Sequence, residues 1–102
     1  MLRRFKTVFG GVYLLSDERW SHITEKHPEI KRYANKIKEV LFSPDLIKVS
    51  KKDRTVYLLY KFYREIFDGK YLLIVVHVLK KEIITAFITD KIKEGDIIWQ
   101  KR

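Results

Sequence analysis

The second half of this chain is a run of strand patterns separated by short turns, which limits the folds open to it. Residues 46–50, 55–63, 71–79 and 83–89 are rich in β-branched, aliphatic and aromatic side chains. The breaks between them, Lys52-Asp53, Asp68-Gly69 and Lys80-Lys81, are short and polar or contain glycine, as hairpin turns do. Consecutive strands joined by hairpins pair antiparallel, so this half predicts an antiparallel meander.

A helix is expected directly before this region, and its two ends are marked in the sequence. Ser16 is a suitable N-cap, and Asp17 and Glu18 follow it where the helix dipole favours anions. The helix is expected to run to about Lys26. Pro28 disfavours helical geometry at the residue before it, so the helix should end or kink there.

A second helix is expected over residues 29–42, and together the elements predict an α+β fold. Its apolar side chains recur at helical spacing: Ile30, Tyr33, Ile37, Val40 and Leu41. A short strand pair around Gly10-Gly11 is expected over residues 6–15, and a last short segment over 97–99. We therefore expect one domain over residues 1–102, with two N-terminal helices packed on one face of a four-stranded, or slightly larger, antiparallel sheet.

The composition narrows the class of protein. Hydrophobic residues make up 46% of the 102 residues, enough for a core without a disulfide or metal to support it. The absence of cysteine excludes a disulfide framework and thiolate metal sites. No apolar run is long enough to span a bilayer, and the first residues lack the apolar stretch of a signal peptide, so a cytoplasmic location is expected.

The charge balance points to an anionic partner. The chain has 22 Lys and Arg residues against 13 Asp and Glu residues, a formal net charge of +9. A strongly basic surface attracts phosphate and favours a nucleic-acid partner. The alternative is a lysine-rich solubilising surface of the kind common in thermophile proteins.

Two of the three histidines lie in residues 20–29, WSHITEKHPE. Histidine can both accept and donate a proton near neutral pH, so His22 and His27 are candidates for acid–base chemistry. Their five-residue separation is about 140° around a helix, which is poor for shared metal ligation, so no metal site and no cofactor are expected. The simpler alternatives are that His27 only caps the helix end and that His22 is an ordinary surface histidine.

Strand alternation divides the side chains of the meander into two sets. We assign Val56, Leu58, Tyr60 and Phe62 to the face that packs against the helices. The open face would then carry aromatic rings, cations and hydroxyls suited to single-stranded RNA, namely Tyr57, Lys61, Tyr63, His77, Thr85 and Thr89. The alternative is the ordinary polar outer face of a half-exposed sheet.

An ordered set of motifs carries a family resemblance from Arg19 to Trp99. It comprises W-S-H-I-x-x-x-H-P-E, Tyr33 and Ile37 in the second helix, S-P-D before the first main strand, Lys52-Asp53-Arg54, the Leu59-Tyr60-Lys61 strand, Gly69-Lys70, and I-T-A-F-I-T-D-K-I-K-E-G-D-I-I-W. The chain resembles the phage-associated branch of the barnase–EndoU–colicin–RelE-like nuclease superfamily. That resemblance implies two N-terminal helices packed on a four-stranded antiparallel sheet.

The resemblance also implies metal-independent cleavage of RNA by attack of a ribose 2′-hydroxyl on the adjacent phosphate, with an acid, a base and cationic groups assisting. It implies catalytic roles for His22, His27, Lys61, Thr85 and Thr89, and phosphate contact by Arg54. Residues Tyr57, Tyr63 and His77 join them as substrate-binding candidates from the face assignment. Phe87 departs from the family pattern, because relatives often carry tyrosine there.

Two further functions fit the same sequence. One is a non-catalytic RNA- or ribosome-binding module that keeps the basic surface. The other is a component of a toxin–antitoxin pair, in which an acidic antitoxin or immunity-type protein docks on the basic surface. The expected nucleic-acid partner is RNA, either single-stranded or a tRNA or mRNA.

Overall fold

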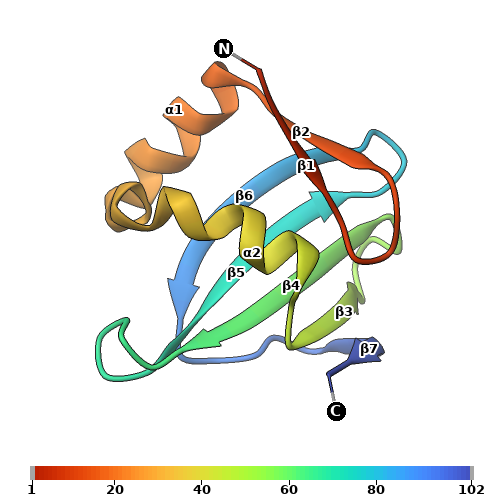
Figure 1. The fold of residues 1–102 in the computed structure, drawn as a ribbon. Coiled ribbons are helices and arrows are strands. Elements are labelled where there is room, and N and C mark those ends of the chain that lie inside the picture. The colour runs from red at the N-terminus through yellow and green to blue at the C-terminus, as the bar shows by residue number, and fades with distance from the viewer. Residues whose placement is uncertain (1, 102) are drawn as a thin grey trace.

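A seven-stranded mixed sheet with helices over one face forms the framework of the protein. The computed structural model describes residues 2–101 and is drawn in Figure 1. The strands lie in the order β1-β2-β6-β5-β4-β3-β7. In chain order the elements are β1 (Arg3–Lys6), β2 (Val12–Leu15), α1 (Asp17–Lys26), the 3-10 helix η1 (Pro28–Lys36), α2 (Ile37–Phe42), β3 (Leu46–Ser50), β4 (Val56–Tyr63), β5 (Lys70–His77), β6 (Glu82–Thr89) and β7 (Gly95–Gln100).

The α+β class agrees with the sequence prediction, but the predicted sheet and the placement of the helices are wrong. The meander β3-β4-β5-β6 is antiparallel as expected. The hairpin β1–β2 extends it on one side and β7 on the other, and the helices follow β2 instead of starting the chain. The strand signals of these short segments are local, whereas their pairing partners are set by contacts distant in sequence.

The sheet is mixed because β2 and β6 run parallel, and their contact is short. Strand β2 joins β6 through a single pair, Leu14↔Glu82. The backbone N–H of Leu14 also donates to the carbonyl of Lys81 at 2.9 Å. This pairing seats the N-terminal hairpin beside β6 and so places the start of α1 at that edge.

The helical region confirms the predicted boundaries of α1 and corrects the second helix. The Ser16 hydroxyl accepts the N–H of Arg19 at 3.1 Å, and α1 ends at Lys26 just before Pro28. The single helix expected over 29–42 is wrong, because residues 28–36 wind as a 3-10 helix interrupted at Tyr33 and only Ile37–Phe42 is α-helical. Apolar residues three apart suit both windings, so their spacing could not separate the two.

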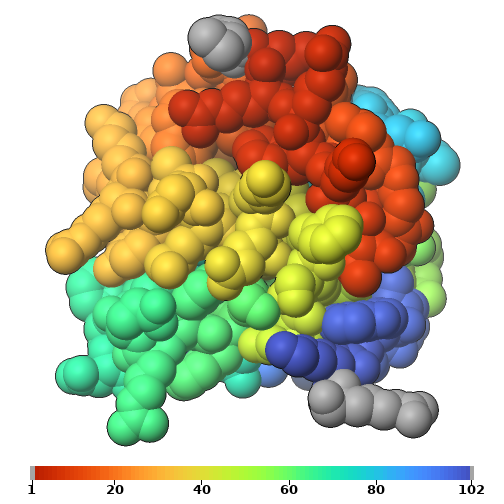
Figure 2. Space-filling view, viewed as in Figure 1, coloured from red at the N-terminus to blue at the C-terminus, as the bar shows by residue number. Residues whose placement is uncertain are grey.

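The main core lies between the helices and one face of the sheet. Its fully buried side chains include Ile23 of α1, Ile30 of η1 and Ile37 of α2, packed against Leu59 and Ile74 of the sheet. In the space-filling view of this side, the helical segment (orange to yellow) lies between the N-terminal hairpin (red) and the β4–β5 turn (green) (Figure 2).

The predicted assignment of faces in β4 is wrong. Leu59 and Tyr63 belong to the core under the helices, whereas Leu58 and Tyr60 form a second, smaller cluster on the other face with Leu73. Both alternating sets of β4 are rich in apolar and aromatic residues, so alternation defined two sets without showing which one faces the helices.

The second cluster is partly covered by the segment that connects β6 to β7. The backbone N–H of Lys93 donates to the buried Tyr60 hydroxyl at 2.9 Å. Burial raises the pKa of Tyr60, and the bond from Lys93 opposes that rise.

Across residues 2–101 no helix combines the length and the apolar character that crossing a bilayer would need.

Candidate functional site

A groove runs between α1 and β6 at one side of the sheet. It has a volume of about 580 Å³. Helix α1 and its C-cap form one wall, and β6 with the β6–β7 segment forms the other. The lining residues are Arg19, His22, Ile23, Lys26, His27, Ile84, Thr85, Phe87 and Lys93. We call this feature the α1–β6 groove.

The helical wall presents a row of basic side chains. Arg19, His22 and Lys26 follow i, i+3, i+7 spacing, which places them on one face of α1. All three are exposed. The neighbouring stripe holds Ile23, which is buried in the core and fixes the rotation of the helix. Burial of one stripe therefore directs the adjacent cations into the groove.

His27 lies at the junction of α1 and η1, where its ring is held from two sides. As the C-cap of α1 it donates its backbone N–H to the carbonyl of Ile23 at 2.7 Å. Its imidazole stacks on Phe87, with ring centroids 4.9 Å apart and an interplanar angle of 24°. Nδ1 lies 3.8 Å from a carboxylate oxygen of Glu29, and the side chain is 30% exposed. The ring is thus oriented and still open to a bound molecule.

Lys93 supplies a cation from the opposite wall. Its backbone is fixed by the Tyr60 hydroxyl and by Lys48, whose ammonium donates to the Lys93 carbonyl at 3.0 Å. Its own ammonium lies 5.4 Å from the centroid of the Phe87 ring. Phe87 therefore contacts both His27 and Lys93, one from each wall.

A β-bulge shapes the strand wall. The pairing of β5 with β6 shifts between Val75, which faces Thr85, and Val76, which faces Ile83. The extra residue, Ile84, and Thr85 both line the groove. Bulges commonly re-aim side chains beside functional sites, and this one places a hydroxyl among the basic residues.

The charge of the groove is one-sided. Its nine lining residues include three permanently charged cations, Arg19, Lys26 and Lys93, and no carboxylate. Arg19 and His22 also border a smaller hollow of about 250 Å³, where Glu18 and Glu82 are present. Cations beside an apolar floor suit an anion that carries a flat ring.

Three of the predicted site residues meet in the α1–β6 groove, namely His22, His27 and Thr85. The others lie elsewhere. Lys61 is 14% exposed near the end of α2, where its ammonium donates to the Ser43 carbonyl at 2.7 Å and lies 3.8 Å from Asp45. Ser43 is the C-cap of α2, and neither Lys61 nor its two partners line the α1–β6 groove.

Arg54 and the two tyrosines lie away from the groove. Arg54 pairs with Asp96 of β7 at 2.5 Å. The Tyr57 ring packs edge-on against Phe9 of the N-terminal hairpin. The buried Tyr63 hydroxyl donates to Glu39 at 2.8 Å, and burial together with this carboxylate raises the pKa of Tyr63 far above its ordinary value.

His77 and Thr89 are engaged in turns at opposite ends of the sheet. Nε2 of His77 lies 3.2 Å from the Thr55 hydroxyl, and Nδ1 accepts the N–H of Lys80 at 3.2 Å. The Thr89 hydroxyl donates to the Lys91 carbonyl at 3.2 Å and accepts the Lys91 N–H at 3.1 Å. It lines a separate hollow next to the groove.

Sequence reasoning missed Arg19, Lys26 and Lys93. The first two had a usable signal, because their i, i+3, i+7 spacing through His22 marks one basic helix face. Lys93 lies within the motif I-T-A-F-I-T-D-K-I-K-E-G-D-I-I-W, but its position at the groove depends on the pairing of β7 with β3. Over residues 2–101, no three His, Cys, Asp or Glu side chains form a group that could hold a metal ion.

Comparison with known proteins matches the chain to a family. A family model described as phage-Barnase-EndoU-ColicinE5/D-RelE like nuclease2 matches residues 2–100. No curated protein and no solved structure matches the sequence. The match covers every helix and strand described above, including both walls of the α1–β6 groove.

Proposed function

The chain belongs to the phage-Barnase-EndoU-ColicinE5/D-RelE like nuclease2 family, and from this we infer that it cleaves RNA in the α1–β6 groove. The family makes it a nuclease-like domain and confirms the resemblance found in the sequence. RNA as the substrate, the groove as the site and histidine as the acid–base group are our proposal.

The composition of the groove is the observation that carries this proposal. Two histidines and three permanent cations line it without a carboxylate. Cations lining the groove stabilise the extra negative charge on a phosphate in the transition state. The apolar floor formed by Ile84 and Phe87 suits the ring of a nucleotide.

The proposed reaction is a transesterification within the RNA. A neutral imidazole takes the proton of a ribose 2′-hydroxyl, and the 2′-oxygen attacks the adjacent phosphorus. The bond from phosphorus to the 5′-oxygen breaks, and a protonated imidazole gives its proton to that oxygen. The products are a 2′,3′-cyclic phosphate and a 5′-hydroxyl. His22 and His27 are the two proton-transfer residues.

The remaining groups position the RNA and its charge. Arg19, Lys26 and Lys93 contact the phosphate, and the Thr85 hydroxyl donates to a ribose or phosphate oxygen. A carboxylate oxygen of Glu29 lies 3.8 Å from Nδ1 of His27, at the side of the imidazole next to the hollow that Glu29 lines.

The test is cleavage of mixed RNA by pure protein in EDTA. We compare wild type with His27→Ala and His22→Ala, and expect each change to lower the rate by about 10²–10⁴-fold, the usual contribution of a general acid or base. Cyclic phosphate ends identify the chemistry, and a 2′-deoxy residue at the cleaved position should block it.

His77→Asn is the matched control, because it removes the third histidine outside the groove and leaves an oxygen that can accept the N–H of Lys80. Thermal unfolding of every variant checks the fold. If wild type binds RNA in a salt-dependent manner but leaves it intact, the cleavage proposal fails and the non-catalytic RNA-binding module is the correct description.

A further inference from the structure

We propose that Phe67 is a stacking platform for one base of the RNA, in a subsite beside the α1–β6 groove. This inference rests on the proposed function, since it takes RNA as the ligand. Phe67 lies in the turn between β4 and β5 and is 61% exposed. Single exposed apolar side chains are common on protein surfaces, and what sets Phe67 apart is the turn that holds it and the hollow beside it.

The turn holds this ring outward in a strained conformation. Phe67 and the following Asp68 both have positive φ, 45° and 61°, and Gly69 completes the run at 112°. Few residues other than glycine adopt this region, and strained residues tend to cluster at functional sites.

Contacts on both sides of Phe67 fix the turn. Ile66, the preceding residue, is fully buried in the core. Its N–H donates to the Tyr63 carbonyl at 3.3 Å, and its own carbonyl accepts the N–H of Gly69 at 2.9 Å. The ring is therefore displayed on a short, anchored turn, which lowers the entropy lost when a ligand stacks on it.

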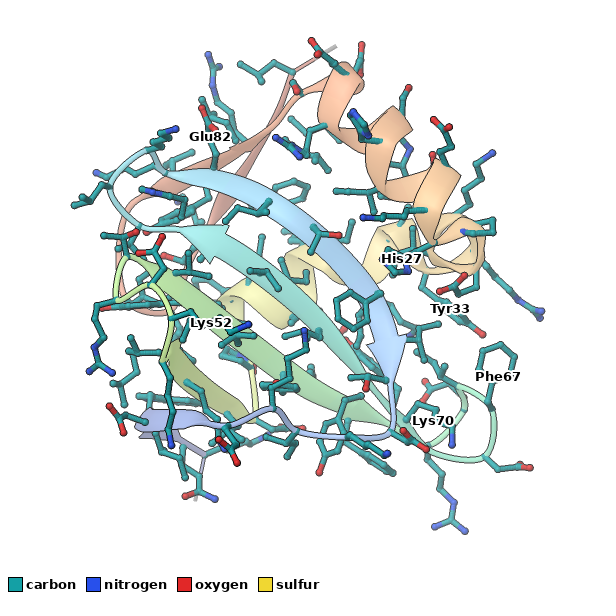
Figure 3. The ribbon with its side chains drawn as sticks, turned by 180° about the vertical axis from the view of Figure 1, so that it is seen from behind. His27, Tyr33, Lys52, Phe67, Lys70 and Glu82 are labelled. Carbon is teal, nitrogen blue, oxygen red and sulfur yellow. The ribbon has the colours of Figure 1, made fainter. Side chains whose placement is uncertain are left out.

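Phe67 borders a hollow of about 500 Å³ that we call the Phe67 hollow. Its lining residues are Glu29, Phe67, Lys70, Ile88, Thr89 and Asp90. Figure 3 shows His27, Phe67 and Lys70 along one side of the molecule.

Two connections join this hollow to the groove. Glu29 lines the hollow and lies 3.8 Å from the imidazole of His27. On β6, Phe87 lines the groove and the next two residues, Ile88 and Thr89, line the hollow. A strand of RNA whose phosphate lies at His27 therefore has a neighbouring nucleotide within reach of Phe67.

The charges of the hollow select a base over a phosphate. Glu29 and Asp90 bring two carboxylates against the one ammonium of Lys70, which lies 4.0 Å from Asp90. An anion is disfavoured there, in contrast to the basic groove. A base is neutral and flat, and its N–H groups can donate to carboxylate oxygens. The basic groove therefore suits the phosphate of the RNA, and the Phe67 hollow suits a base.

The test is a binding experiment that requires no cleavage. Fluorescence anisotropy measures the affinity for 2′-O-methyl RNA oligonucleotides, which lack the attacking hydroxyl. One oligonucleotide is intact, and each of the others lacks a single base at a different position. For wild type, loss of the base that stacks on Phe67 should weaken binding about tenfold, typical of base–aromatic stacking.

Phe67→Ala should weaken binding of the intact oligonucleotide by the same factor and make it insensitive to that missing base. Phe67→Trp should restore the sensitivity. Phe67→Gly should bind RNA as the alanine variant does. Its melting temperature should be higher than that of the alanine variant, because glycine tolerates the positive φ. Leu79→Ala, which removes another exposed side chain in the β5–β6 turn, is the matched control and should bind like wild type.

The inference is overturned if Phe67→Ala and Phe67→Gly bind the intact and the base-deleted oligonucleotides as wild type does. Cleavage in the earlier assay would then leave the proposed function standing without the subsite. The converse result, coupling between Phe67 and one base in a protein that cleaves no RNA, keeps the subsite and removes the proposed catalysis.

Discussion

Replacing Phe87 by alanine should separate positioning of His27 from stability of the fold. Phe87 is partly buried and packs against the second core cluster as well as His27. Fully buried Phe→Ala changes cost about 3–5 kcal/mol, so we expect a loss near 2 kcal/mol at this partly exposed site. For a domain of this size the melting temperature should fall by roughly 4–8 °C per kcal/mol.

The expected effect on cleavage follows from the lost ring contact. A stacked aromatic pair contributes about 0.5–1.5 kcal/mol beyond burial. Without it, the oriented imidazole of His27 loses about 1 kcal/mol against its other rotamers, which corresponds to about a fivefold lower rate. This effect is far smaller than that of removing the imidazole itself.

The assay compares kcat for Phe87→Ala, Phe87→Tyr and wild type at a temperature where all three are folded. Phe87→Tyr keeps the stacking ring and should retain the wild-type rate. Proton NMR of the His27 ring gives a readout independent of catalysis, since its ring-current shift should vanish in the alanine variant only. A folded Phe87→Ala protein with unchanged kcat and an unchanged His27 spectrum would refute the positioning role.

Two further predictions concern the frame around the site. Gly95→Ala would place a Cβ 2.5 Å from the backbone carbonyl oxygen of Val49, so we expect the free energy of unfolding, measured by chemical denaturation, to fall by about 1–3 kcal/mol. RNA binding should also weaken, because the segment that carries Lys93 shifts. Unchanged stability and unchanged RNA binding would contradict the pairing of β3 with β7. Tyr63→Phe removes the bond to Glu39 and should cost about 1 kcal/mol at pH 7. Because the pKa of Tyr63 is raised in the folded protein, the hydroxyl contributes its full stabilisation below the ordinary tyrosine pKa of about 10 and loses it as the pH rises above that value. The stability difference between wild type and Tyr63→Phe should therefore shrink in thermal melts at alkaline pH. A difference that stays constant with pH would contradict this.

Local features of the fold could be predicted from the sequence because their causes are local. The Ser16 cap, the helix end before Pro28 and the turns of the meander each depend on a few adjacent residues. The 3-10 winding of residues 28–36 and the attachment of β7 to β3 depend on packing and pairing across the chain. These are the features that the sequence pattern missed.

The candidate site also combines residues that local sequence signals identify with residues whose positions depend on distant contacts. His22 and His27 were found from residue type, and Thr85 from its strand position, yet their meeting depends on α1 lying along β6. Lys61 had the expected charge, but it shares the helix-covered face with Leu59 and its ammonium bonds the end of α2. Lys93 lies in the last motif of the family resemblance, but its place beside Phe87 depends on the path of the β6–β7 segment. Residue chemistry therefore identified the candidates, while pairing between distant strands determined which ones share a surface.

Strands β2 and β6 share fewer paired residues than any other neighbouring strands of the sheet. Strand β6 is held along its length by β5, whereas the N-terminal hairpin meets it only at Leu14↔Glu82. Helix α1 follows that hairpin with only Ser16 between them, and its own anchor is the burial of Ile23 in the main core. Few hydrogen bonds across a boundary mean a low free energy of local opening. Amide protons of β1 and β2 should therefore exchange with solvent before those of β4 and β5, which are each paired along both edges.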